Sequence, residues 1–201
     1  MKCLINQGIV RGCKDNMGGL LWAIGINYAN GEGIASVNSG ITQDSEPIAA
    51  GVVTSITMSN GKVGFKYVSQ KNTSSYTDTS AGSKETGTSS WKPVLNLSFA
   101  KHEASKRNQI LFLSRGETTW IVKDRNDRFW LLGFHNGMEI TPGENIQSGV
   151  QAADLNGIKI TLEGEERVPA YEIFITDVAT TEAMIVNSVL GGSGSGSGFG
   201  I

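Results

Sequence analysis

Short apolar runs separated by glycine and polar turns recur along the chain and predict a protein built mainly from strands. Apolar and polar residues alternate over residues 158–163, which is typical of a half-buried strand. We expect strands over residues 20–28, 52–58, 63–68, 91–99, 118–123, 129–134, 158–163, 171–176 and 183–190. About nine strands with so little helix exclude a parallel α/β sheet. An antiparallel β-sandwich or β-barrel is therefore the expected fold class.

Turn residues predict how some of these strands connect. Asn60-Gly61 separates residues 52–58 from residues 63–68 and predicts a hairpin. The polar residues 124–128 predict a second hairpin, because they lie between two aromatic and β-branched runs. Pro93 cannot donate a backbone hydrogen bond, so we expect it at a sheet edge or at the start of its strand.

One packing α-helix is expected over approximately residues 101–115. Most of these residues are good helix formers, and Ala104, Ile110, Leu111 and Leu113 supply an apolar side. Gly116 is well placed to end the helix.

Residues 72–90 form a long polar stretch with 11 Ser or Thr in 19 positions. Only Tyr76 and Ala81 are apolar there, so the stretch is not expected to contribute to a core. Polar segments of this length are usually functional or disordered. Two interpretations follow: a surface loop without fixed structure, or an arm or long hairpin that becomes ordered against a neighbouring subunit.

Residues 191–201 form a Gly/Ser-rich C-terminal extension to a single β-rich domain over residues 1–190. Such repeats are typical of flexible linkers and also of engineered tails. Phe199 and Ile201 give the segment an apolar tip, which suits insertion into a groove of a neighbouring copy.

Composition and charge exclude several classes of protein. The 17 Lys and Arg residues nearly balance 19 Asp and Glu residues, for a formal charge of −2, whereas a dedicated nucleic-acid binder is normally strongly basic. A hydrophobic content of 39% excludes an acidic disordered chain. The longest apolar run, residues 20–24, is too short for a signal peptide or a membrane span. We therefore expect synthesis in a cytoplasm and no membrane partner.

The sequence offers no convincing catalytic or metal-binding group. Cys3 and Cys13 are interpreted as buried thiols, with a bridge between them as the lesser alternative, and neither His102 nor His135 has a metal-like spacing to them. The carboxylates of residues 163–166 are typical of a solvated loop. We expect no enzyme activity, no cofactor and no metal.

Three stretches, in a fixed order, carry a resemblance to a known family. The first is CLINQGI from residue 3 followed by GCKDNMGGL from residue 12; the second is NQILFLSRGETTWIVKDRNDRFWLLGFHNGMEI, residues 108–140; the third is NGIKITLEGEE, residues 156–166. Together they resemble phage tail structural proteins from phages of Bacteroidota hosts, including crAss-like phages. The polar stretch has no counterpart in the family motifs, and the chain continues beyond Glu166. The role of the polar stretch is therefore inferred from its composition alone, while the additional residues after Glu166 favour added contacts between rings, or a neck or terminator ring.

The resemblance implies a virion protein: a self-assembling tail-tube subunit whose hexameric rings stack into the channel for DNA ejection. Its partners would be further copies and other phage tail or neck proteins, with DNA only as non-specific cargo. A charge near zero suits a conduit, because a basic lining would bind phosphate. A head–tail connector or neck ring and a capsid decoration protein are alternatives. A carbohydrate-binding β module, using Trp91, Trp120 and Trp130, is an alternative from another class.

The expected contacts between subunits lie in the polar stretch and the C-terminal extension. They are Tyr76, Thr79, Lys84, Thr86, Trp91, Phe199 and Ile201. A second group comprises Trp120, Phe129, Trp130 and Leu131. We expect these residues in the predicted 118–134 hairpin and in the core, with some of them exposed at a subunit seam.

Overall fold

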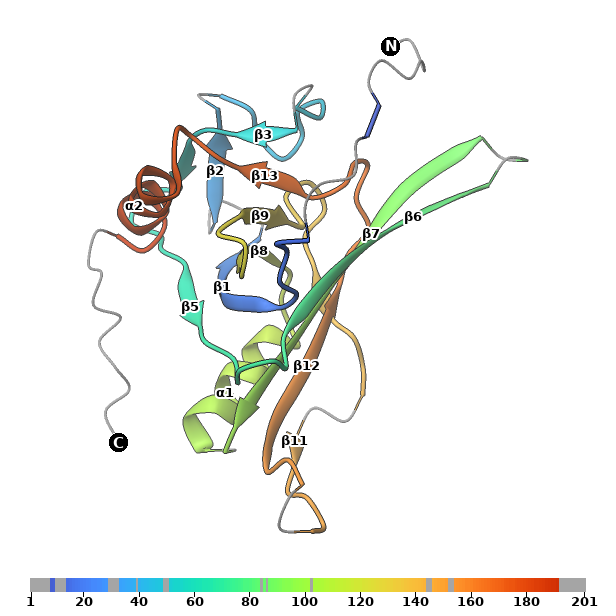
Figure 1. The fold of residues 1–201 in the computed structure, drawn as a ribbon, viewed down its shortest axis with the longest axis vertical. Helices are drawn as coiled ribbons and strands as arrows, with labels where there is room; N and C mark the ends of the chain where they lie inside the picture. The colour runs from blue at the N-terminus through green and yellow to red at the C-terminus, as the bar shows by residue number, and fades with distance from the viewer. Residues whose placement is uncertain are drawn as a thin grey trace.

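The computed structural model confirms the mainly β class (Figure 1). It describes residues 8–9, 14–28, 33–38, 40–48, 51–83, 85, 87–101, 103–143, 146–151 and 154–191. These residues form 13 strands in three sheets and two helices, rather than about nine strands and one helix. The sheets have open edges and do not close into a barrel, and all strand pairs but one are antiparallel.

A central six-stranded sheet carries most of the core. Its order is β3 (Val52–Val53), β13 (Tyr171–Ile173), β9 (Phe129–Leu132), β8 (Thr118–Asp124), β1 (Leu20–Asn27) and β5 (Phe65–Tyr67). Strands β1, β8 and β9 are apolar on both faces, because alternate side chains enter two different cores. The first core contains Trp22, Ile24, Ile121, Phe129 and Leu131, and the second contains Ala23, Trp120, Val122 and Leu132.

A second sheet and helix α1 cover the second core. The sheet has the order β10 (Glu139–Ile140), β12 (Gly157–Glu163), β7 (Thr88–Ala100) and β6 (Ser75–Ser83), and β11 (Ile146–Gln147) also pairs with β12. Helix α1 (Ala104–Leu113) buries Ile110 and Leu113 in this core, so the predicted helix is confirmed. Alternate residues of β12 are buried, as the sequence pattern predicts.

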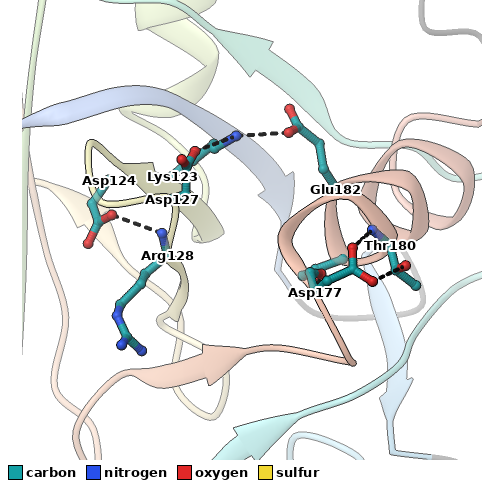
Figure 2. Close-up of polar contacts among 8 residues, drawn as sticks. Lys123, Asp124, Asp127, Arg128, Asp177, Thr180 and Glu182 are labelled. Carbon is teal, nitrogen blue, oxygen red and sulfur yellow. Dashed lines mark hydrogen bonds and ion pairs between the residues drawn. The ribbon is translucent and has the colours of Figure 1, made fainter.

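The first core is covered by β2 (Ile34–Val37), β4 (Ile56–Met58) and helix α2 (Val178–Ser188). The strand predicted over residues 183–190 is wrong, because these residues belong mostly to α2. Asp177 caps the helix: its carboxylate accepts hydrogen bonds from the Thr180 amide at 2.9 Å and the Thr180 hydroxyl at 2.8 Å (Figure 2). Ile185 then faces the core one turn after Thr181, at helical rather than strand spacing.

A buried cation joins α2 to the central sheet. The Lys123 ammonium lies 2.8 Å from the Glu182 carboxylate of α2 and 3.2 Å from that of Asp127 (Figure 2). Burial alone would lower the pKa of Lys123, but hydrogen bonds to the two carboxylates outweigh it and the pKa is raised.

Neither helix of the described residues is long and apolar enough to cross a membrane.

The hairpin predicted around Asn60-Gly61 is wrong. Strand β4 pairs with β2, whereas β5 pairs with β1 of the central sheet. The turn therefore carries the chain from one layer to the next instead of reversing it within a sheet. The other predicted hairpin, β8–β9, is confirmed by its register from Trp120↔Leu132 to Lys123↔Phe129.

Pro93 lies inside β7, which is flanked on both sides, so its predicted position at an edge or strand start is wrong. The carbonyl of Pro93 accepts from the Gly164 amide at 3.1 Å, just beyond the last β12 pair, Glu163↔Val94. Proline has no backbone N–H to donate, but the regular pairing of β7 with β12 already ends at Val94, so no hydrogen bond of that ladder is lost at Pro93.

Gly133 connects β9 to the following turn in a conformation that favours glycine. Its φ is +65°, and a Cβ there would lie 2.6 Å from Cγ of Met138. We expect Gly133→Ala to lower the free energy of unfolding by about 2 kcal/mol or more, measured by urea denaturation. Gly116→Ala is the control, because a Cβ there meets only ordinary contacts and should change stability by less than about 0.5 kcal/mol. Equal stability of the two variants would contradict this assignment.

Candidate assembly interface

Strands β6 and β7 form a long hairpin whose outer part leaves the body of the protein (Figure 1). The two strands pair from Ser75↔Asn96 to Ser83↔Thr88. Beyond the last β12 pair, β7 is linked to the body by the hydrogen bond from the Gly164 amide to the Pro93 carbonyl and by an isolated bridge between Trp91 and Glu166. We call residues 81–90 the outer arm. A surface loop without fixed structure is therefore the wrong interpretation of residues 72–90, because β6 and β7 form a hairpin. That the arm becomes ordered against a neighbouring subunit stays a prediction.

The outer arm has no buried side chain among its described residues. On β6, Tyr76 and Asp78 are half-buried, whereas every residue from Thr79 to Gly82 is exposed. Isolated two-stranded hairpins are at best marginally stable in water. The outer edge of β6 also has no strand partner within the described part of the chain. The outer arm thus exposes backbone groups and polar side chains to a partner, and it gains little stability from burial within its own chain.

The base of the arm is held by aromatic and polar contacts. The Tyr76 and Trp130 rings pack with centroids 6.0 Å apart. The Asp78 carboxylate accepts from the Ala170 amide at 2.7 Å. Burial, helped by the charges of nearby carboxylates, raises the pKa of Tyr76 to about 12, so its hydroxyl stays protonated at neutral pH.

A buried polar network lies next to this base. The Glu166 carboxylate accepts from the backbone amides of His135 at 3.0 Å and Asn136 at 3.1 Å. Nδ1 of His135 lies 2.7 Å from the Gln43 carbonyl, which can only accept, so this nitrogen carries a proton. Nε2 of His135 lies 2.8 Å from the Tyr171 hydroxyl, which donates to it when the ring is neutral. Each of these buried groups has a partner.

The network has little room for a substrate. The void beside it, lined by Glu166 and Tyr171 among others, measures about 10 Å³, which is no more than a single water needs. Burial raises the pKa of Glu166, against the hydrogen bonds from the two amides that lower it. No group of three or more His, Cys, Asp or Glu side chains in the described ranges could hold a metal ion. The backbone bridge between Glu166 and Trp91 joins this network to β7 at the base of the arm.

The register shows where the predicted contact residues lie. Tyr76 and Trp91 share the face of the hairpin that turns toward the body and are half-buried, while Thr79 lies on the opposite face and is exposed. The other predicted contacts, Lys84, Thr86, Phe199 and Ile201, lie outside the described residues. Of the four residues predicted for the 118–134 hairpin and core, Trp120, Phe129 and Leu131 are buried, and Trp130 is half-buried.

The prediction of a solvated loop at residues 163–166 is wrong for Glu166, which is only 6% exposed. Glu163 does reach solvent and pairs with Lys92 at 2.6 Å. The partners of Glu166 come from the turn after β9, about thirty positions away in sequence. Nothing local in the sequence distinguishes it from its neighbours Glu163 and Glu165.

No protein-family model, curated protein or solved structure matches this chain.

Proposed function

We propose that this protein is a virion structural protein, a tail-tube subunit that self-assembles into stacked rings through which DNA passes. The observation that carries the proposal is the outer arm. A subunit that functions alone gains nothing from a polar ribbon extended into solvent, whereas a subunit of a ring gains a contact. DNA is non-specific cargo in this proposal, and other tail or neck proteins are the remaining partners.

Open sheet edges support assembly through backbone pairing. Strand β6 is an edge of the second sheet, and β5 and β3 are the edges of the central sheet. A strand of one copy can extend the sheet of the next by hydrogen bonds that require no particular side chain. If such a contact joins two different surfaces and closes, it produces a ring. The formal charge of −2 is compatible with a channel that does not retain DNA.

The tail-tube assignment within this class rests on the resemblance of the three sequence stretches. Two of them supply ordered parts of the fold: residues 118–132 contain the β8–β9 hairpin, and residues 157–163 form β12. A neck ring or a decoration protein would use the same arm, and the number of copies in a virion separates these roles. The carbohydrate-binding alternative is weakened because Trp120 is fully buried and cannot stack on a sugar.

Shortening the arm tests the proposal. Residues 82–89 are replaced by Asn-Gly, which closes the Ala81↔Ser90 pair with a two-residue turn. Both backbone groups of Trp91 bond to Glu166, so Ala81↔Ser90 is a pair whose backbone groups face each other. We expect the wild-type chain to form rings, seen by light scattering after size exclusion and by negative-stain microscopy. The association constant of the shortened variant should fall at least about tenfold, because the loss of a contact worth about 1.4 kcal/mol changes an equilibrium constant tenfold.

Two controls make the result specific. Ser89→Thr keeps the length of the arm and should assemble like the wild type. Cooperative urea unfolding of the shortened variant should be retained, because the removed residues bury no side chain. A wild-type chain that stays monomeric at the highest concentrations reached, or a shortened variant that assembles normally, would contradict the proposal.

A further inference from the structure

Asn-Gly pairs begin at Asn60, Asn136 and Asn156 within the described part of the chain, and a further pair, Asn30-Gly31, lies outside it. Asparagine is one of the chemically labile residues of proteins. Its side-chain amide can react with the backbone nitrogen of the next residue, and glycine hinders that attack least because it has no side chain. The local sequence is the same at the three described pairs, so a difference in their reactivity comes from the fold.

Asn60 and Gly61 occupy an exposed turn between β4 and β5. The Lys62 amide donates to the Ser59 carbonyl at 3.0 Å to close the turn, and Gly61 has a φ of +73°. Neither the Asn60 side chain nor the Gly61 amide makes a hydrogen bond within the described residues. A Cβ at Gly61 would meet no atom within 4 Å, so the space around it is open. The two groups that must react therefore have no hydrogen bond of their own to lose.

The turn is anchored on both sides, so a change within it leaves the rest of the fold in place. Before it, the Ser59 amide donates to the Gly33 carbonyl at 2.9 Å, and after it the Gly64 amide donates to the Val189 carbonyl at 2.8 Å. Asn60 itself belongs to neither core. The protein can thus be modified at Asn60 and stay folded.

The pair at Asn136 is restrained by hydrogen bonds and packing. Nδ2 of Asn136 donates to the Glu165 carbonyl at 2.6 Å, and its backbone amide donates to the Glu166 carboxylate at 3.1 Å. Gly137 is buried, and a Cβ there would lie 3.0 Å from Cγ of Tyr28. The Asn136 side chain must therefore lose a hydrogen bond, and Gly137 must move within a packed site, before the two can react.

The pair at Asn156 is restrained by strand pairing. Gly157 is buried and pairs with Ala100 of β7 on one side and with Gln147 of β11 on the other. A Cβ at Gly157 would lie only 2.1 Å from the Phe99 carbonyl oxygen, so β7 packs closely against it. The Gly157 nitrogen cannot turn toward the Asn156 side chain while β12 stays paired with both neighbouring strands.

We propose that Asn60 is a site of spontaneous deamidation in the folded protein, whereas the fold protects Asn136 and Asn156. The Gly61 nitrogen attacks Cγ of Asn60, and a new C–N bond closes a five-membered imide ring. The bond from Cγ to the side-chain nitrogen breaks, and this nitrogen takes up the proton lost by the Gly61 nitrogen and leaves as ammonia. This inference does not rest on the proposed assembly function.

Water completes the reaction by opening the ring at either of its carbonyl carbons. One opening gives aspartate, and the other gives isoaspartate, in which the backbone runs through the former side-chain carbon. No oxidant or reductant takes part, since the net change is the loss of ammonia and the gain of water. Both products carry a carboxylate, so each adds one negative charge to the exposed turn.

Peptide mass spectrometry of the folded protein, incubated in mildly alkaline buffer, tests the proposal. Each event raises the mass of a peptide by about 1 Da, so the peptide that covers each pair reports on its own site. We expect Asn60 to deamidate at least about tenfold faster than Asn136 or Asn156, because those sites must first open locally. In guanidinium chloride the three sites should react at similar rates, since the fold no longer distinguishes them.

Asn60→Gln is the matched control. Glutamine keeps a neutral amide, but its extra methylene group would require a six-membered ring. On anion exchange, the wild type should develop a more acidic species that elutes with the Asn60→Asp variant, and Asn60→Gln should develop at least about tenfold less of it. Equal rates at the three sites of the folded protein, or a reaction of Asn60 that occurs only in guanidinium chloride, would overturn the proposal.

Discussion

Trp120→Ala is expected to lower the free energy of unfolding by about 3–5 kcal/mol, the range for truncating a fully buried aromatic residue. Trp120 has no exposed surface and lies at the centre of the second core. Its ring packs on Tyr67 with centroids 5.1 Å apart, and its indole N–H donates to the Thr118 hydroxyl at 2.8 Å. Urea denaturation followed by far-UV circular dichroism measures the change without relying on tryptophan fluorescence.

The size of this effect comes from burial and not from the loss of an aromatic ring as such. Phe112→Ala is the matched control, because Phe112 is 66% exposed on α1 and its truncation should cost less than about 0.5 kcal/mol. Since domains are typically stable by only about 5–15 kcal/mol, the Trp120 variant is expected to be partly unfolded in moderate urea. A loss below about 1 kcal/mol for Trp120→Ala would mean that the second core repacks around the cavity.

The strands of the central sheet were predictable because a strand that is buried on both faces appears in the sequence as a run of apolar residues. Residues 20–26, 118–123 and 129–132 are nearly continuous apolar runs bounded by turns, and such runs are typical of strands covered on two sides. The same patterns cannot say what covers each face. The sequence therefore predicted the strands correctly but not the three-layer arrangement, in which two cores lie on opposite faces of one sheet.

Helix α2 was not predicted from the sequence, because its composition favours a strand. Val178, Ile185 and two threonines are β-branched residues that favour strands when judged one at a time. The helix forms since Asp177 caps its first turn and Ile185 packs into the first core. A search for capping residues, rather than for apolar runs alone, would have found its start.

The Asn60-Gly61 turn shows the limit of local turn chemistry. Asn-Gly favours a tight reversal, but whether the flanking strands pair is decided by where their side chains are buried. Ile56 packs in the first core with β2, and Tyr67 packs against the second core from β5. Tertiary packing therefore separates two strands that the local sequence would join.

Glu166 is the polar residue on which the base of the arm depends most. We expect Glu166→Ala to lower the free energy of unfolding by about 2–4 kcal/mol, since the buried amides of His135 and Asn136 both lose their acceptor at about 1–3 kcal/mol each. The backbone of Glu166 also bridges Trp91 on β7, with hydrogen bonds of 2.8 Å in both directions. Hydrogen exchange of the peptide containing Trp91 should accelerate together with the loss of stability seen in urea.

Glu166→Gln separates the hydrogen bonds from the charge. A glutamine oxygen can still accept from both amides, so this variant should be much more stable than Glu166→Ala.

Burial raises the pKa of Glu166 in the folded protein above its ordinary value of 4.5, so the folded state binds the proton more tightly than the unfolded chain. The contribution of Glu166 to stability is therefore greatest below that value and falls as pH rises toward the raised folded pKa. Urea unfolding from pH 4 to pH 7 should show the wild type losing stability relative to the glutamine variant. A wild type that gains stability over this range relative to the variant would show that the ionised carboxylate is favoured by its two amide donors more than it is penalised by burial.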